Sequence, residues 1–329
     1  MGVRCEMKRR QFLALSIMAA LSKGGEVMAA SRRTGLVLDE RFSLHQIHQS
    51  HPESPARYQA ITEHVLEHDL VSAVSMIAAK KDSEKWLRLV HSQQHIDSIK
   101  TKQAKTHQHA VLATAGILAA VDAVFSGKVD NAFCASRPPG HHARDTGKEE
   151  GFCYYNHIAI AARYAQKIYG VKKVLIVDWD FHHGNGTEWA FYSDPDVLYF
   201  STHDMFSYPG TGSPSKKGEG AGKGFNINVH LECGATDDDI IQAFEQKLLS
   251  VVDDFSPELI LISAGFDSRQ DDLLGCHEIS DQGFVTLTEM LKTLADKHCN
   301  GRIISVLEGG YNIQGNASAV TAHIKSLMT

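Results

Sequence analysis

The sequence predicts a three-layer α/β/α domain with a mainly parallel sheet. Short apolar, β-branched runs alternate with helix patterns along the chain, and this alternation is typical of β-α repeats. Several runs are apolar throughout, as in strands buried on both faces of a parallel sheet. The predicted strands cover residues 35–38, 131–135, 173–180, 197–202, 225–229, 259–264 and 302–307. Ligands gather at the carboxyl ends of such strands, so polar residues that follow these runs are candidates for a functional site.

The helix patterns between these strands have recognisable ends. Ser54-Pro55 offers an N-cap followed by a proline in the first turn, where its missing N–H costs nothing. Thr236 is followed by three aspartates, whose charge suits the positive end of a helix dipole. An alanine-rich segment over residues 109–126 stops at Gly127, a typical C-terminal cap.

Composition and charge narrow the class of protein. The chain is 43% hydrophobic and 22% charged, which is ordinary for a globular protein. Its net charge of −6 gives no basic footprint for nucleic acid or an anionic membrane. The sequence contains no linker-like stretch and no repeat, so we expect one domain over residues 30–329 without a membrane span.

The N-terminus has a different character. Arg9-Arg10-Gln11-Phe12-Leu13 opens a short apolar run, and small residues follow up to Ala29-Ala30. A basic region, a short apolar segment and a small-residue site describe a secretory signal. The paired arginines resemble the twin-arginine type, whose pathway exports folded proteins. We expect residues 1–29 to be a signal peptide and the mature protein to be periplasmic; otherwise the protein is cytoplasmic.

The cysteines do not form a recognisable disulfide framework. No two of them are spaced as CxxC, and we expect most to be buried thiols. They are Cys5, Cys134, Cys153, Cys233, Cys276 and Cys299.

Candidate metal ligands follow the run over residues 173–180. This run ends in Asp178-x-Asp180-x-His182, and side chains on a strand alternate faces with period two. The three side chains therefore project to one face, and two carboxylates with an imidazole are typical metal ligands. Acidic, imidazole or phenol groups also follow other strands, in the segments RPPGHHA (137–143), GFD (265–267) and EGGY (308–311).

Together these segments resemble the histone deacetylase superfamily, which consists of zinc-dependent amidohydrolases on the arginase-like fold. The similarity is greatest to its class II-like and bacterial branch, which includes the acetylpolyamine aminohydrolases. The motifs occur in the family's order over residues 34–312. They are HPESPAR (51–57), RPPGHHA (137–143), GFC (151–153), DWDFHHGNGT (178–187), YPGTG (208–212), SAGFD (263–267) and LEGGY (307–311). Seven ordered motifs are far more specific than a single His-His pair.

The resemblance implies two ion sites. Asp180, His182 and Asp267 would hold one zinc ion with a position left open for water, the arrangement of a catalytic zinc. Ferrous iron would suit the same ligands. An inner monovalent-cation site, usually occupied by potassium, would form around Asp178, Asp180, His182, Ser201 and Thr202.

The resemblance also implies catalytic roles. His142 would be the general base that later protonates the leaving amine, and His141 the second, electrostatic histidine. Asp178 would orient His141, and Asn185 would orient His142 at a position where some relatives have Asp. Tyr311 would donate to the tetrahedral oxyanion. Because this residue is Tyr and not the His of weakly active members, we expect an active deacetylase.

A narrow substrate channel is implied as well. Phe152 and Tyr208 match the aromatic walls that enclose an acyl-lysine stem, and Gly151 lines the floor. We therefore expect hydrolysis of an acetyl-lysine side chain in a protein or peptide, with release of acetate. The alternative substrate is an acetylpolyamine or another small acetylated amine. Leu274 argues against it, because polyamine-selective relatives carry an acidic residue at this position.

Two other functions remain as hypotheses, an inactive binding module and a binuclear manganese ureohydrolase. The intact catalytic set disfavours the first, and the single Asp-x-Asp-x-His disfavours the second. Other polar residues have simpler interpretations. We expect His183 to be a buried structural imidazole, Cys153 to serve packing, and Asp271 and Asp272 to be ordinary loop carboxylates. We expect His45, His48 and His51 to lie in a solvated loop, and His91, His95, His107 and His109 to be surface or helix-packing residues.

Overall fold

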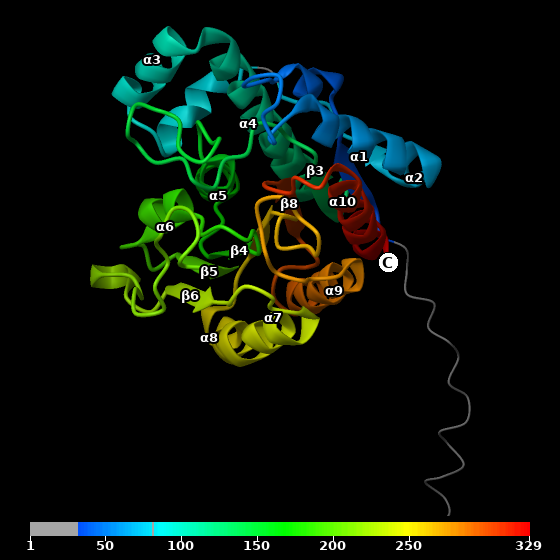
Figure 1. Ribbon diagram of the computed structural model, residues 1–329. Helices are drawn as coiled ribbons and strands as arrows, with labels where there is room; N and C mark the ends of the chain where they lie inside the picture. The colour runs from blue at the N-terminus through cyan, green and yellow to red at the C-terminus, as the bar shows by residue number, and fades with distance from the viewer. Residues whose placement is uncertain (1–31, 81) are drawn as a thin grey trace, which may run out of the picture. The chain divides into compact units, whose positions relative to one another are not determined.

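A computed structural model describes residues 32–80 and 82–329 (Figure 1). Residues Arg32–Met328 form one compact unit. The predicted signal peptide over residues 1–29 lies outside the described residues, and so does Cys5.

The core of this unit is an all-parallel sheet with strand order β2-β1-β3-β8-β7-β4-β5-β6. Each predicted strand is present to within a few residues, and the predicted sheet is confirmed. The structure adds β2, which was missed because it pairs through only two residues at the sheet edge. The strands are β1 (Thr34–Val37), β2 (Ser75–Met76), β3 (Asn131–Cys134), β4 (Val174–Asp178), β5 (Val197–His203), β6 (Asn226–His230), β7 (Leu259–Ala264) and β8 (Ile303–Leu307).

Helices cover both faces of the sheet, which confirms the three-layer architecture (Figure 1). On one face α4 packs against β1, β3 and β8, beside α5; on the other, α10 packs against β1 and β3, and α9 against β7. The helices are α1 (Pro55–Glu67), α2 (Leu70–Ala73), α3 (Gln93–Lys102), α4 (Ala104–Phe125), α5 (His157–Tyr169), α6 (Asn185–Phe191), α7 (Asp237–Ala243), α8 (Leu249–Phe255), α9 (Asp281–His298) and α10 (Ile313–Met328). A π-helical segment, Phe244–Leu248, joins α7 to α8.

The predicted helix ends agree with local chemistry. α1 begins with Pro55 directly after Ser54, and Thr236 forms a capping box with Asp239 at the start of α7. α4 begins earlier than expected, at Ala104, and Gly127 follows it with a φ of 69°, which favours glycine. By length and composition α4 could cross a membrane, but most of it is buried in the interior, as in the core helix of a globular unit.

The cysteine prediction is partly wrong. Cys134, Cys153 and Cys299 are buried thiols, as expected. Cys233 and Cys276, however, form a disulfide across a separation of 43 residues. It joins the loop after β6 to the loop after β7, a contact that the spacing of cysteines in the sequence cannot show.

A buried ion-pair network connects α1 and the residues before it to the segment that follows β3. The Glu53 carboxylate accepts hydrogen bonds from Nε and Nη2 of Arg137, each at 2.6 Å, and from Arg57 at 3.3 Å. Arg137 also donates to the carbonyls of Phe42 and His45. Because these donors and acceptors satisfy one another, the charges are stable in a dry interior.

His45 lies beside this network and not in a solvated loop, so that prediction is wrong for His45. Burial, with the nearby Glu53 opposing it, lowers the pKa of His45 to about 4. His48 is exposed, as expected. The ring of His51, in contrast, packs edge-on against that of Phe152, with the two ring centroids 4.4 Å apart.

We expect Arg137→Met to lower the free energy of unfolding by about 3–5 kcal/mol, because it leaves the buried Glu53 carboxylate short of its main partner. Chemical denaturation would measure the loss. The matched control is Arg33→Met, which removes an exposed partner of Asp130 and should change stability little. Equal losses in the two variants would contradict this view of the network.

Candidate metal centre and catalytic pocket

The four motif-bearing strands are neighbours in the middle of the sheet, in the order β3-β8-β7-β4. Their carboxyl ends therefore meet at one edge, and the polar residues that follow them converge there. Asp178 is the last residue of β4 and is fully buried. Its Oδ2 accepts a hydrogen bond from the Tyr199 hydroxyl at 2.9 Å, and its Oδ1 accepts one from the Asp180 N–H.

Asp180, His182 and Asp267 form a cluster in which the candidate ligand atoms lie within 4.8 Å of one another. His182 Nδ1 is 3.0 Å from Asp267 Oδ2 and 3.3 Å from Asp180 Oδ1. Backbone N–H groups orient both carboxylates: Gly309 donates to Asp180 and Phe181 to Asp267, each at 2.8 Å. The structure thus brings together the three residues predicted to bind zinc.

The electrostatics of this cluster fit a divalent cation. Burial, reinforced by the charge on Asp180, raises the pKa of Asp267 to about 7. Burial disfavours the charged form of His182, but hydrogen bonds to Asp180 and Asp267 outweigh it and raise its pKa to about 10. Two buried carboxylates that both lie beside His182 Nδ1 favour positive charge at this position, from the imidazolium or from a bound cation. The oxygen and nitrogen donors are those that zinc prefers.

Glycines make room for the cluster. A Cβ at Gly265 would overlap the Asp180 carboxylate, and one at Gly309 would overlap that of Asp267. Both glycines belong to the motifs read from the sequence. Their role is close approach of the backbone to the ligands, as the tight turns after β7 and β8 require.

The two histidines after β3 differ in their surroundings. Burial lowers the pKa of His142, and the neighbouring His141 and His182 lower it further. Burial acts on His141 in the same direction, but the charges of Asp180 and Asp178 outweigh it and raise its pKa well above the usual value. One imidazole therefore favours the neutral form and the other the charged form.

Hydrogen bonding also sets the tautomer of His142. Its Nδ1 lies 2.8 Å from Asn185 Oδ1, and an amide oxygen only accepts, so Nδ1 carries the proton. The Nε2 atom of neutral His142 is then left as an acceptor. His141 Nδ1 faces Asp178 Oδ2 at 3.1 Å, as the sequence predicts for the second histidine.

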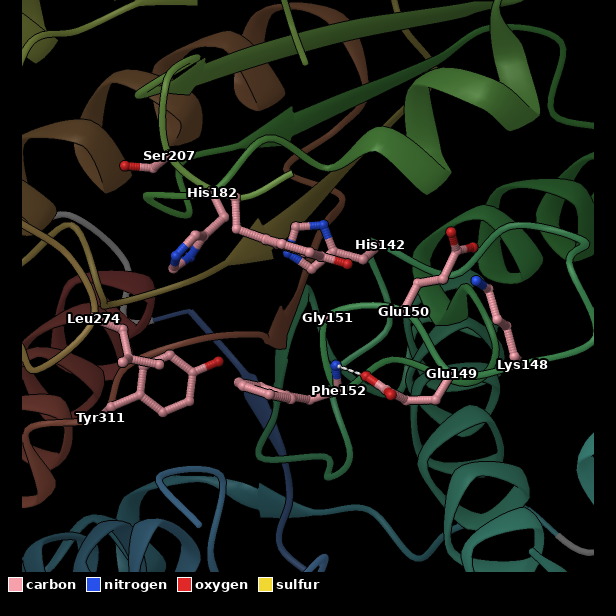
Figure 2. Close-up of a pocket in the computed structure, with 11 residues that line it drawn as sticks. His142, Lys148, Glu149, Glu150, Gly151, Phe152, His182, Ser207, Leu274 and Tyr311 are labelled. Atoms are coloured by element: carbon pink, nitrogen blue, oxygen red, sulfur yellow. Dashed lines mark hydrogen bonds between the residues drawn. The ribbon is translucent and has the colours of Figure 1, made fainter. Parts of the chain in front are cut away.

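A pocket of about 650 Å³ leads to these groups (Figure 2). The predicted substrate-binding residues Gly151, Phe152, Tyr208 and Leu274 all line it, together with His142, His182 and Tyr311. In Figure 2 the Tyr311 hydroxyl points toward Phe152 and into the space below the two imidazoles. Sequence reasoning missed Lys148, Glu149, Glu150 and Ser207, which also line the pocket.

The aromatic wall has an unusual backbone. Phe152 has a φ of 68° and follows Gly151 with a φ of 53°. The Glu149 carboxylate accepts the Phe152 N–H at 2.5 Å (Figure 2). A Cβ at Gly151 would overlap the His142 ring. The left-handed turn therefore brings the channel wall directly against the candidate base.

Of the predicted monovalent-cation residues, Asp178 ends β4 and lies opposite Ser201 of β5, which Thr202 follows on the same strand. Asp180 and His182 lie in the segment after β4. His203 Nε2 lies 2.8 Å from the Gly212 carbonyl, so its Nδ1 accepts the Ser201 hydroxyl proton. The Ser201 oxygen keeps its lone pairs available. Thr202 Oγ1 is buried and has no hydrogen-bond partner in the described part of the chain.

A second group of potential ligands, His91, His95 and Asp145, was not predicted. Three of its four imidazole nitrogens make other hydrogen bonds, and His91 Nδ1 has no partner in the described part of the chain. His95 bonds the Tyr154 carbonyl through Nε2 and the Gly147 N–H through Nδ1. His91 accepts the Asn156 N–H. We therefore interpret this group as a structural cluster in the wall behind the pocket.

Of the remaining residues with sequence predictions, most lie as expected and Asp272 does not. His183 is buried and pairs with the Thr211 hydroxyl at 2.7 Å, and Cys153 is a buried thiol; both agree with the predictions. His91, His95 and His107 are buried in helix packing. Asp272, in contrast, is no ordinary loop carboxylate, because it accepts the Tyr311 N–H at 2.7 Å.

Comparisons with known proteins identify the family of this chain. The model of the histone deacetylase domain matches residues 51–327. The chain is 37% identical to Histone deacetylase 15 of Arabidopsis thaliana, over 93% of this chain and 58% of that protein. It is 33% identical to a probable deacetylase of Archaeoglobus fulgidus, over 86% of this chain and 82% of that protein.

The fold comparison gives the same answer. A crystal structure of the HD domain of HDA15 superposes with a TM-score of 0.84 at 37% identity, covering 91% of this chain and 89% of the other. The fold is therefore that of an arginase/deacetylase-like protein. The chain belongs to the histone deacetylase family, as its motifs predict.

We expect Asp267→Asn to weaken zinc binding by at least about 100-fold, since even residues that only orient metal ligands contribute about 10- to 100-fold. Equilibrium dialysis against a zinc buffer would measure it. Asp271→Asn is the matched control: it removes a nearby carboxylate outside the cluster and should bind zinc like the unaltered protein. Unchanged affinity in Asp267→Asn would contradict the assignment.

Proposed function

We propose that the protein is a zinc-dependent deacetylase that hydrolyses acetyl-lysine side chains in proteins or peptides and releases acetate. The observation that carries the proposal is the Asp180–His182–Asp267 cluster at the base of a pocket that also presents His142 and Tyr311. Membership of the histone deacetylase family supports it. The chain spans 58% of the length of Histone deacetylase 15.

The metal would be held by Asp180, His182 and Asp267. When bound, zinc supplies a Lewis acid for the acyl carbonyl and lowers the pKa of a water molecule toward about 7. The chain's own residues supply the remaining steps.

His142 acts as the base. Its neutral form, with the proton on Nδ1 held by Asn185, leaves Nε2 to take a proton from the attacking water and to return it to the leaving amine. His141, whose Nδ1 pairs with Asp178, would in its protonated form stabilise negative charge that develops nearby. The Tyr311 hydroxyl donates a hydrogen bond to the oxyanion.

The pocket favours a substrate whose acetyl group is carried on a linear aliphatic amine. Phe152 and Tyr208 form walls for a methylene chain, and Leu274 adds an apolar rim. This rim supports acetyl-lysine over acetylpolyamine. The second candidate, a small acetylated amine, is favoured by one observation: the Glu149 and Glu150 carboxylates line the pocket and would attract a second amine. Arg144, which pairs with Glu150, offsets part of that charge.

We further propose that a potassium ion binds between the segment Asp178–His182 on one side and Ser201 and Thr202 on the other. The available lone pairs of Ser201 and the unpartnered Thr202 hydroxyl support this proposal. Oxygen ligands of this kind suit a hard monovalent cation.

We expect a fluorogenic acetyl-lysine peptide to be hydrolysed by the zinc-loaded protein, with N-acetylputrescine turned over more slowly. Tyr311→Phe should lower kcat by about 10²–10³-fold with zinc content unchanged, because one oxyanion donor is lost. Turnover of the small amine alone would favour the second candidate. Turnover of neither compound by zinc-loaded protein would contradict the deacetylase proposal.

We also propose that residues 1–29 direct export of the folded protein to the periplasm. The Cys233–Cys276 disulfide supports this proposal, because disulfides persist in oxidising compartments. With Arg9 and Arg10 both replaced by Lys, we expect a tagged full-length chain to stay in the cytoplasm. Cell fractionation would show it, with Arg4→Lys as the control. Equal periplasmic amounts for the unaltered and the Arg9/Arg10 chains would contradict the signal.

A further inference from the structure

The Asp272 carboxylate bridges two segments of the pocket that are far apart in the sequence. Its Oδ2 accepts the backbone N–H groups of Tyr311 and Asn312, at 2.7 and 2.9 Å. Its Oδ1 accepts those of Leu274 and Gly275, at 2.9 and 3.3 Å. One side chain thus holds both the segment that carries the oxyanion donor and the turn that forms the channel rim.

On the Tyr311 side, the carboxylate completes a clamp on the backbone. The carbonyl of Gly310 accepts a hydrogen bond from Arg57 Nε at 2.6 Å, and the next N–H, that of Tyr311, donates to Asp272. The Arg57 guanidinium also lies over the Tyr311 ring, 4.9 Å from its centroid. The two charged side chains therefore fix the residue from opposite directions, which restricts where its hydroxyl can point.

On the rim side, the turn that Asp272 closes packs against the backbone of Asp267. A Cβ at Gly275 would overlap the carbonyl of Asp267, so the turn lies directly against the backbone of a predicted zinc ligand. The following residue, Cys276, is tied to Cys233 by the disulfide. The turn is consequently anchored at its C-terminal end, and the hydrogen bonds of Asp272 connect it to the backbone of Tyr311.

We propose that Asp272 is a positioning residue that sets the Tyr311 hydroxyl relative to the metal cluster and couples it to the Leu274 rim. The inference rests on the proposed function, because it concerns the oxyanion donor of that reaction. Asp272 itself does not line the pocket, so it acts through Tyr311 and not by contact with the substrate.

The charge and symmetry of a carboxylate are both needed for this role. Four N–H donors converge on two oxygens. An asparagine offers one acceptor oxygen and would turn its NH₂ group toward two of those N–H groups. Asp272→Asn therefore disrupts one of the two connections while changing the side-chain volume little.

The test measures kcat, KM and zinc content of Asp272→Asn in the full-length zinc-loaded protein with the acetyl-lysine peptide. We expect kcat to fall by about 10- to 100-fold, because small displacements of a catalytic group cost this much, while zinc content stays unchanged. The matched control is Asp271→Asn. Asp271 contributes only its backbone carbonyl, to Asn312 Nδ2, and its φ of 62° suits asparagine, so kcat should be unaffected.

The decisive comparison repeats Asp272→Asn in the Tyr311→Phe background. If Asp272 acts through the Tyr311 hydroxyl, its replacement should have little further effect once that hydroxyl is gone, which gives a non-additive double-mutant cycle. A loss of equal size in both backgrounds would overturn the proposal, since it would indicate a general structural role. A kcat for Asp272→Asn equal to that of Asp271→Asn would overturn it as well.

Asp272→Glu guards against failure to fold. It keeps both acceptor oxygens, and we expect kcat between those of the unaltered protein and Asp272→Asn. If Asp272→Asn does not fold, the two-background comparison is made with Asp272→Glu, and an equal loss again overturns the proposal. Failure of the proposed function looks different, because the unaltered protein would then not hydrolyse the peptide at all.

Discussion

Asp180 and Asp267 stand with their carboxylates on either side of His182 Nδ1, in an interior that excludes water almost completely. Such an arrangement is costly unless positive charge lies between the two groups. Backbone donors orient both carboxylates: the N–H of Gly309 donates to Asp180, and that of Phe181 donates to Asp267. Because β4 and β7 are adjacent and β8 follows β7, the sheet itself brings the ligands and their donors to one edge.

The same carboxylates separate the roles of two neighbouring histidines. His141 lies close to Asp178 and Asp180, which favour its charged form. His142 faces an uncharged amide, that of Asn185. Its burial lowers its pKa and so favours the neutral form. Two imidazoles on consecutive residues, with ring centroids 4.0 Å apart, thus have pKa values shifted in opposite directions, which suits the electrostatic role proposed for His141 and the base role proposed for His142. The division arises from their partners, because the residue type is the same.

Much of the fold and of the candidate site could be predicted from the sequence, because the motifs at the strand ends are contiguous stretches of sequence. Apolar runs marked the strands, and Asp-x-Asp-x-His marked one side of the metal cluster. Three of the missed features depend on contacts between distant segments. The Cys233–Cys276 disulfide joins two loops, His45 is buried beside Arg137 and Glu53, and Asp272 reaches Tyr311 across 39 residues. Nothing in the local pattern around these residues distinguishes them from ordinary loop positions.

The central claim is that this family member binds its catalytic metal at Asp180, His182 and Asp267. Anomalous X-ray diffraction at the zinc edge, from crystals of the zinc-loaded protein, tests it most directly. The prediction is one strong peak about 2.0–2.2 Å from the oxygens of both aspartates and from a nitrogen of His182. A strong peak at the His91–His95–Asp145 group instead, or the absence of a peak between the two aspartates in zinc-saturated crystals, would contradict the claim.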